Sequence, residues 1–156
     1  MITLLETLLE RSDGAYIEPQ DLDQVDQTLQ SWGDRRITYQ LIQEKEEKIV
    51  DETLRRFQTE NEVLLRSAPE TVLKKCKGDL ISVLRNCATA MLLQDEELLK
   101  DRFLYWMQNI MRALKNQKYN NEVYRIIQEV IQEELPAPYA QLMLPYLQVT
   151  HQYLSE

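Results

Sequence analysis

The sequence has few of the residues that interrupt helices or build reactive sites. Its 156 residues include three glycines, five prolines, two cysteines and one histidine. Scarce glycine, beside abundant Gln, Glu and Leu, disfavours hairpin-rich β folds. No apolar run approaches the roughly 20 residues that span a bilayer, and the N-terminus lacks the features of a signal peptide. We therefore expect a cytoplasmic, helical protein without membrane insertion.

The motifs of common enzymes are also missing. CxxC, HExxH, GxGxxG, P-loop and GxSxG patterns do not occur. The single histidine, His151, lies six residues from the C-terminus and is expected to be a solvated residue near a helix end rather than a ligand. The net charge of −8 and a pI near 4.8 argue against binding to nucleic acid. We expect neither an enzyme nor a nucleic-acid-binding protein.

Hydrophobic periodicity predicts about eight helices in one domain, residues 1–156. Apolar residues at spacings of three and four predict helices over 2–11 and from Pro19 to Trp32, with Gly33 and Asp34 ending the second helix and starting a third, 35–59. Further helices are predicted over 61–66, 70–93, 95–114, 119–134 and 138–154. Unequal lengths and irregular proline breaks predict an all-α fold of crossed helices rather than an up-and-down bundle.

Both cysteines fall on one predicted helix, 70–93. They belong to an apolar stripe made of Val72, Cys76, Leu80, Val83, Cys87 and Ala90. Along a helix, Cys76 and Cys87 would lie roughly 16 Å apart, too far for a disulfide. Reduced thiols are therefore expected, as in the cytosol.

Cys76 is the more interesting thiol because of its neighbours. Lys74, Lys75 and Lys77 surround it with positive charge, which predicts a lowered thiol pKa and a reactive nucleophile. Asp79 follows at i+3, at the edge of the apolar stripe, where an unpaired carboxylate is costly. The alternative is that Cys76 is a small buried hydrophobic residue with no chemical role.

Three stretches occur in an order typical of one family: SDGAYIEPQDLDQV, WGDRRITYQLI, and KKCKGDLISVLRNCATAML followed by LLKDRFL. Together they resemble the phycobiliproteins, the light-harvesting subunits of phycobilisomes, and the chain looks like a divergent, allophycocyanin-like member. Cys76, Asp79 and Arg85 stand where the family's chromophore helix carries Cys, Asp and Arg. The resemblance covers roughly residues 3–114.

The resemblance implies a globin-like fold with two additional N-terminal helices. Residues 1–32 would form docking helices and residues 33–156 a globin-like core. The partner would be another phycobiliprotein-like subunit or a second copy of the chain, with Asp13 meeting Arg85 across the interface. Such an oligomer would belong to a phycobilisome-type assembly at the thylakoid surface. The alternative is that both N-terminal helices fold back on their own core.

The resemblance also implies a cofactor. Cys76 would form a thioether to a linear tetrapyrrole (a bilin of phycocyanobilin type), and Asp79 would accept hydrogen bonds from its central pyrrole N–H groups. Lys75 and Lys77 would pair with its propionates, whereas Gly78 replaces a family arginine and Gln94 a family glycine. These departures keep a second hypothesis open, a colourless relative that acts as an assembly, adaptor or regulatory module.

Overall fold

The computed structural model describes residues 1–66, 71–115 and 117–156, without the side chains of residues 64, 71 and 72. Within these ranges every regular element is a helix. In chain order the elements are α1 (Ile2–Arg11), α2 (Pro19–Gln30), α3 (Trp32–Glu60), α4 (Glu62–Leu65), α5 (Thr71–Leu93), α6 (Glu96–Leu99), η1 (Lys100–Leu104), α7 (Tyr105–Leu114), α8 (Gln117–Glu134) and α9 (Ala137–Ser155). Residue 70 and the Val72 side chain, both used in the sequence predictions, lie outside the described part.

Local sequence explains several helix boundaries. Pro19 begins α2, where its fixed φ is favourable and its missing N–H costs no hydrogen bond. Asp95 precedes α6 and accepts the backbone N–H of Leu98 at 3.1 Å, as an N-cap should. Pro136 lies between α8 and α9, and Pro138 lies in the first turn of α9, where a proline is tolerated. These boundaries agree with the predictions to within one or two residues.

Two predicted features differ from the structure. Gly33 and Asp34 do not separate the second and third helices, because α2 ends at Gln30 and Gly33 is already inside α3. The Ser31 carbonyl already accepts the Arg35 N–H at 3.1 Å, which brings Gly33 into the first turn of α3, and the Arg35 side chain binds the Thr28 carbonyl near the end of α2. The helix predicted over 95–114 contains a π-helical segment, η1, between α6 and α7.

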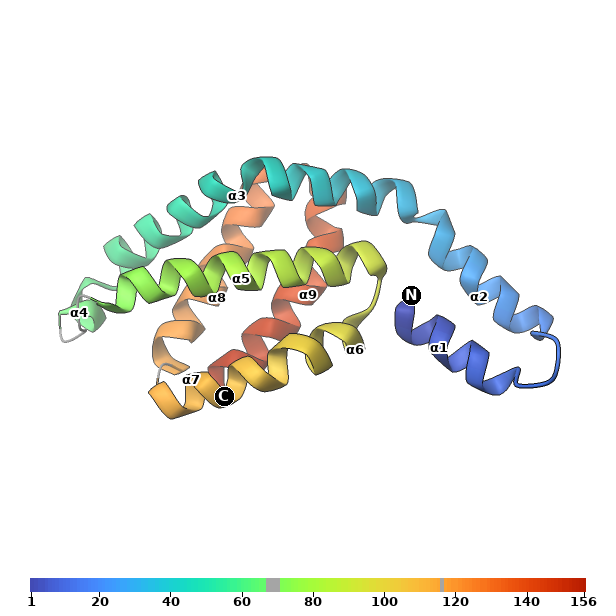
Figure 1. Cartoon of the computed structure of the whole chain (residues 1–156). Helices are drawn as coiled ribbons and strands as arrows, with labels where there is room; N and C mark the ends of the chain where they lie inside the picture. The colour runs from blue at the N-terminus through green and yellow to red at the C-terminus, as the bar shows by residue number, and fades with distance from the viewer. Residues whose placement is uncertain (67–70, 116) are drawn as a thin grey trace.

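The body of the molecule consists of crossed helices. α8 and α9 form an antiparallel hairpin, and α5 runs across it between α3 at one end of the hairpin and α6–α7 at the other (Figure 1). α3 and α5 both pack on this hairpin, and the enclosed side chains are almost entirely apolar. The largest fully buried members are Phe57, Ile49, Leu80, Leu84, Met91, Leu104, Met111, Ile126, Ile127, Ile131, Met143 and Leu147.

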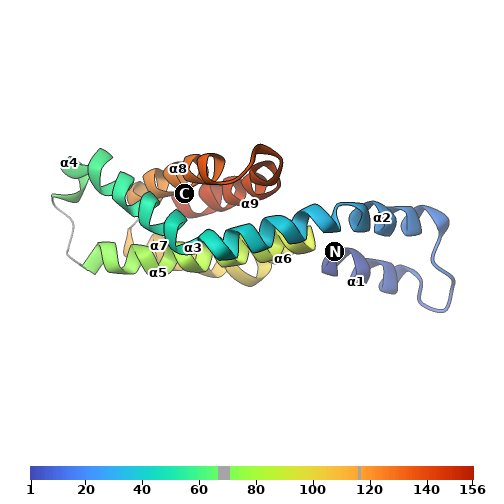
Figure 2. The ribbon, with the colours of Figure 1, turned by 90° about the horizontal axis from the view of Figure 1, so that it is seen from above.

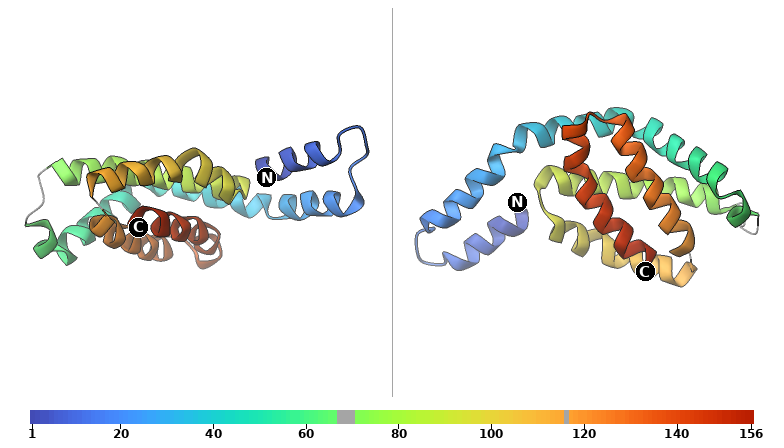
Figure 3. Two further views of the ribbon diagram at one scale, coloured as in Figure 1. Left: turned by 90° about the horizontal axis from the view of Figure 1, so that it is seen from below. Right: turned by 180° about the vertical axis from the view of Figure 1, so that it is seen from behind.

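The first two helices form an arm that projects from this body. Seen from above and from below, α1 and α2 extend beyond the ends of α5 and α6 instead of covering the core (Figures 2 and 3). The arm meets the body near the α5–α6 junction and the start of α3. The structure therefore differs from the alternative in which both helices fold back on their own core.

Candidate functional site

Cys76 and Asp79 lie on the same side of α5, one turn apart. Both side chains are half-buried, whereas Leu80, Val83 and Cys87 further along the face are fully buried. Cys76 packs against the edge of the main core. The pair therefore lies at the boundary between the core and solvent.

Tyr124 of α8 lies next to this pair. It is 2% exposed, and burial raises its pKa well above the ordinary value, with further contributions from the charges of Cys76 and Asp79. Its ring centroid is 6.5 Å from that of His151. The side of α5 that carries Cys76 and Asp79 thus faces the aromatic side chain of α8.

The Asp79 carboxylate is the chemically unusual member of this group. Burial raises its pKa above the ordinary value, and Lys75 partly opposes the shift. No hydrogen-bond donor to Asp79 is found among the side chains and backbone groups that the structure describes. The Asp79 oxygens are not among the fully buried atoms without a partner in the described part of the chain, so solvent still reaches the carboxylate. A ligand with N–H groups can replace that solvent as the hydrogen-bond donor.

The thiol of Cys76 is not activated as the sequence suggested. Burial raises its pKa to about 12, and the charge of Asp79 adds to the shift. Lys74 and Lys75 are exposed, and they stand at helix positions that do not face the thiol. The prediction of a lowered pKa is therefore wrong, because loss of hydration outweighs the nearby positive charges.

The raised pKa predicts slow alkylation of Cys76 in the native protein. A pKa near 12 instead of 9.0 lowers the thiolate fraction at pH 8 by about 1000-fold. We expect iodoacetamide to modify Cys76 at least 100-fold more slowly in the folded than in the guanidinium-unfolded chain, as followed by mass spectrometry. The rate should rise with pH through pH 10. Equal rates in the two states would contradict the burial argument.

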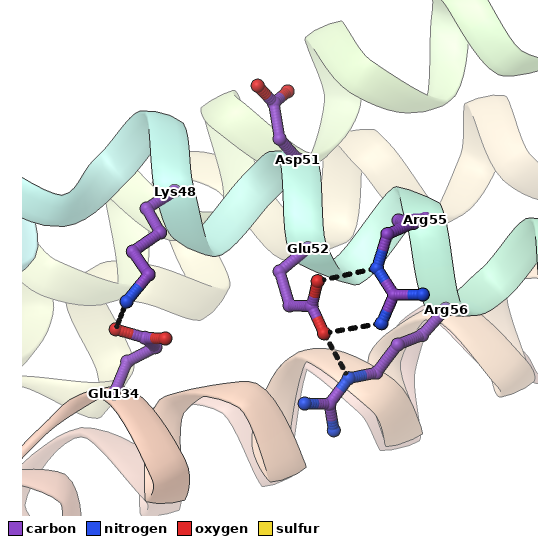
Figure 4. A pocket seen from close by; sticks show the side chains of 6 residues that line it. All are labelled: Lys48, Asp51, Glu52, Arg55, Arg56 and Glu134. Atoms are coloured by element: carbon purple, nitrogen blue, oxygen red, sulfur yellow. Dashed lines mark hydrogen bonds and ion pairs between the residues drawn. The ribbon is translucent and has the colours of Figure 1, made fainter.

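Lys77, the second predicted propionate partner, is already paired. Its Nζ lies 2.6 Å from Oδ1 of Asp51 on α3. In Figure 4, Asp51 points away from a neighbouring cluster in which each cation faces a carboxylate. That cluster lines a groove of about 290 Å³ formed by Lys48, Asp51, Glu52, Arg55, Arg56 and Glu134. Lys75 remains exposed on α5, so it is the lysine better able to meet a ligand carboxylate.

Arg85 has a partner inside its own chain. Its Nε and Nη2 donate to the two carboxylate oxygens of Glu46 on α3, each at 2.7 Å. The Arg85 guanidinium holds the pKa of Glu46 below its ordinary value. The two residues line a groove of about 360 Å³ between α3 and α5. Asp13 is exposed in the turn between α1 and α2 and makes no ion pair within the described chain, so contact with Arg85 of another subunit stays a prediction.

Cys87 and His151 differ in burial, because the core encloses Cys87 whereas His151 is only partly buried. Cys87 is fully buried, with Sγ 3.1 Å from Oγ1 of Thr150, and burial raises its pKa to about 12. The prediction that it is a packed residue is confirmed. His151 bonds Gln128 and Asn121, each at 3.1 Å, and burial lowers its pKa. His151 lies near the end of α9 and keeps one side toward solvent, as predicted, while α8 covers the other side of the ring.

The arm carries a set of exposed apolar side chains. They come from both helices, from the turn between them and from the first residue of α3: Leu5, Leu9, Tyr16, Ile17, Leu22, Leu29 and Trp32. Leu9 is 69% exposed and Tyr16 is 97% exposed. Apolar surface gathered on one projecting element marks an interaction surface.

Two residues important for the arm were missed in the sequence. Arg35 is 2% exposed and Asp95 is 3% exposed, and both bind groups of the arm. Nothing in the sequence distinguishes Arg35, which is buried, from the adjacent Arg36, which is exposed. Asp95 precedes a predicted helix and could have been recognised as an N-cap. Its contact with the N-terminal helix has no signal in the sequence.

The comparisons with known proteins agree with these observations. A family model described as "Phycobilisome protein" matches residues 11–154. No curated protein matches the chain. Among the described residues, no helix is long and apolar enough to cross a membrane. The match and the helical architecture confirm the predicted fold, a globin-like all-α domain with two additional N-terminal helices.

Proposed function

This chain belongs to the phycobilisome protein family, and we propose that it carries a linear tetrapyrrole on Cys76. The pigment, a bilin of phycocyanobilin type, extends along α5 beside Asp79 and Tyr124. Lys75 pairs with one of its propionates, and Lys77 does so only after release from Asp51. The role that follows is absorption or transfer of light energy, without catalysis.

The observation that carries this proposal is the Asp79 carboxylate. It lies one turn from the only half-buried cysteine of the described residues and has no donor there. Pyrrole N–H groups would supply the missing donors, and the carboxylate would balance a positively charged pigment. A tether at Cys76 brings those groups within reach of Asp79 because residues at i and i+3 share a helix side.

The chemistry of attachment follows from the thiol pKa. A thioether forms when the S–H group adds across a carbon–carbon double bond of the pigment, so that sulfur gains a carbon and the proton stays with the adduct. No oxidant or reductant is needed. Since burial disfavours the thiolate of Cys76, spontaneous addition is slow, and an attachment enzyme that supplies a base is required.

We further propose that the arm docks on another subunit of the same family or on a second copy of the chain. The exposed apolar side chains of α1 and α2 support this, as does the groove beside Arg85. Asp13 of one subunit then reaches Arg85 of the other and competes with Glu46 for its guanidinium. Such an oligomer fits a cytoplasmic assembly of phycobilisome type at the thylakoid surface.

The intact mass and visible spectrum of protein purified from its native host test the pigment proposal. We expect the chain mass plus that of one bilin, and a visible absorption band that persists under denaturation because the attachment is covalent. A colourless protein with the unmodified mass would contradict the proposal. The sample should not be exposed to thiol reagents before the measurement.

The second candidate function is a colourless assembly or regulatory module that uses the same arm. The raised pKa of Cys76, the Lys77–Asp51 pair and Gly78 in place of the family arginine favour it. Each of these removes a feature that would attract or fix a pigment. The unmodified mass, together with retained association through the arm, is the outcome that this alternative predicts.

A further inference from the structure

Besides the chain connection between α2 and α3, side chains attach the arm to the body at one corner, residues 92–95, between α5 and α6. Arg35 of α3 makes the first connection, because its two terminal nitrogens donate to the carbonyls of Thr28 and Leu92. The Arg35 side chain thus joins the end of α2 to the end of α5. Its Nε also donates to Ser31 Oγ at 3.1 Å, and its guanidinium lies 5.6 Å from the centroid of the Trp32 ring.

Asp95 makes the second connection from the same corner. Its Oδ2 accepts the backbone N–H of Thr3 at 2.8 Å, and its Oδ1 accepts the Thr3 hydroxyl at 2.8 Å. The same carboxylate caps α6 through Leu98. The hydrogen bonds of Thr3 to Asp95 hold the Asp95 pKa below its ordinary value, although burial opposes them. The start of α1 is therefore fixed to the start of α6, as the position of the N-terminus in Figure 1 shows.

The corner between these two connections has an unfavourable backbone. Gln94 has φ of 50°, the left-handed region that a side chain disfavours. Its side chain is bound by the Ser31 hydroxyl at 3.4 Å. A non-glycine residue keeps such a conformation where surrounding contacts hold it. Here the end of α5 supplies two of them, because the Gln94 N–H donates to the Met91 carbonyl at 3.1 Å and the Asp95 N–H to the Ala90 carbonyl at 2.9 Å, as in a Schellman motif. The Ser31 hydroxyl adds a contact from the end of the arm.

We propose that Arg35 and Asp95 fix the direction of the arm in the free chain, so that its docking surface is preset before any partner binds. The proposal rests on the arm as the docking element of the proposed function. Arg35 suits the task because a guanidinium is a rigid fork that binds two carbonyls at once, and because helix C-terminal ends attract cations. Both residues are positioning residues: neither belongs to the exposed apolar surface of the arm.

A preset arm has a consequence for affinity. A partner that binds a fixed surface does not have to order it, so less binding free energy is lost. When the arm samples many directions and only one of them can bind, the apparent affinity falls in proportion to the fraction of molecules in the binding-competent direction. Loosening the corner should therefore weaken association without changing any residue at the interface.

The test compares Arg35→Gln with Arg36→Gln in a chain kept monomeric by Leu22→Asp. Arg36 is the exposed neighbour on the same helix and makes no ion pair within the described residues, so it is a matched control. We expect amide hydrogen exchange in α1 and α2 to accelerate at least tenfold in Arg35→Gln and to stay unchanged in Arg36→Gln. Exchange in α8 and α9 should stay unchanged in both, which shows that the body remains folded. Small-angle scattering should report a broader distribution of distances for Arg35→Gln alone.

Thr3→Val provides a second variant that leaves the body untouched. It removes one of the two Thr3 donors to Asp95 and should accelerate exchange in α1 more than in α2. Unchanged exchange and scattering in both Arg35→Gln and Thr3→Val would overturn the proposal. Because these measurements use the monomer, they can be interpreted even if the unmodified chain never associates, which is the result that would defeat the docking function instead.

Discussion

Replacing Cys76 by serine should remove all covalently bound pigment from the protein, whereas replacing Cys87 by serine should leave the adduct in place. The assay is co-expression with a bilin source and a suitable attachment enzyme, followed by denaturing electrophoresis and bilin fluorescence. The serine hydroxyl ionises far less readily than a thiol, so Cys76→Ser leaves no nucleophile beside Asp79. Cys87 is fully buried against Thr150, so a pigment has no access to its sulfur.

Asp79→Asn separates attachment from pigment tuning in the same assay. The amide keeps the size of the carboxylate but cannot balance a positive charge on the pigment. The covalent signal should remain, and the absorption maximum should shift. Loss of fluorescence in Cys87→Ser with retention in Cys76→Ser would show that the site has been assigned to the wrong thiol.

Association through the arm should be lost when a charge is placed on its apolar surface. Leu22 is 50% exposed, so Leu22→Asp costs little folding stability in the free chain. In an interface the same change removes about 1.5–3 kcal/mol of apolar burial and buries a carboxylate without a partner. Since each 1.4 kcal/mol is a factor of ten, we expect association to weaken at least 100-fold in sedimentation velocity.

Gln27→Asp is the matched control for this substitution. Gln27 is an exposed polar residue of the same helix, so Gln27→Asp adds the same charge at a position outside the exposed apolar side chains of the arm. Its sedimentation should match that of the unmodified chain. If Leu22→Asp also sediments like the unmodified chain, the arm does not carry the association.

The positions of the helices could be predicted from the sequence more reliably than the burial and the partners of individual side chains. Helical periodicity and prolines located α1, α2, α8 and α9 because these signals are local. Gly33 lies inside α3 instead of ending α2 because glycine is tolerated in a helix at a cost of about 1 kcal/mol. The Arg35 side chain binds the Thr28 carbonyl near the end of α2. No local pattern encodes that contact.

The same contrast applies to the candidate site. The i+3 spacing placed Cys76 and Asp79 on one side of α5, and both are half-buried there. The predicted lowering of the Cys76 pKa is wrong because the sequence shows the neighbouring lysines but does not show the burial of the thiol, which raises its pKa. The partners Asp51 for Lys77 and Glu46 for Arg85 come from α3, 26 and 39 residues away. Long-range ion pairs of this kind depend on helix crossing, which one sequence does not specify.

Attachment of the pigment through Cys76 is tested most directly by peptide mapping of the unmutated, pigmented protein. Trypsin cleaves after Lys75, Lys77 and Arg85, so Cys76 falls in the dipeptide Cys76–Lys77 and Cys87 in the separate peptide Asn86–Lys100. We predict that the visible absorption and the added mass of one bilin elute with Cys76–Lys77. Their elution with Asn86–Lys100, or the absence of any coloured peptide, would contradict the account.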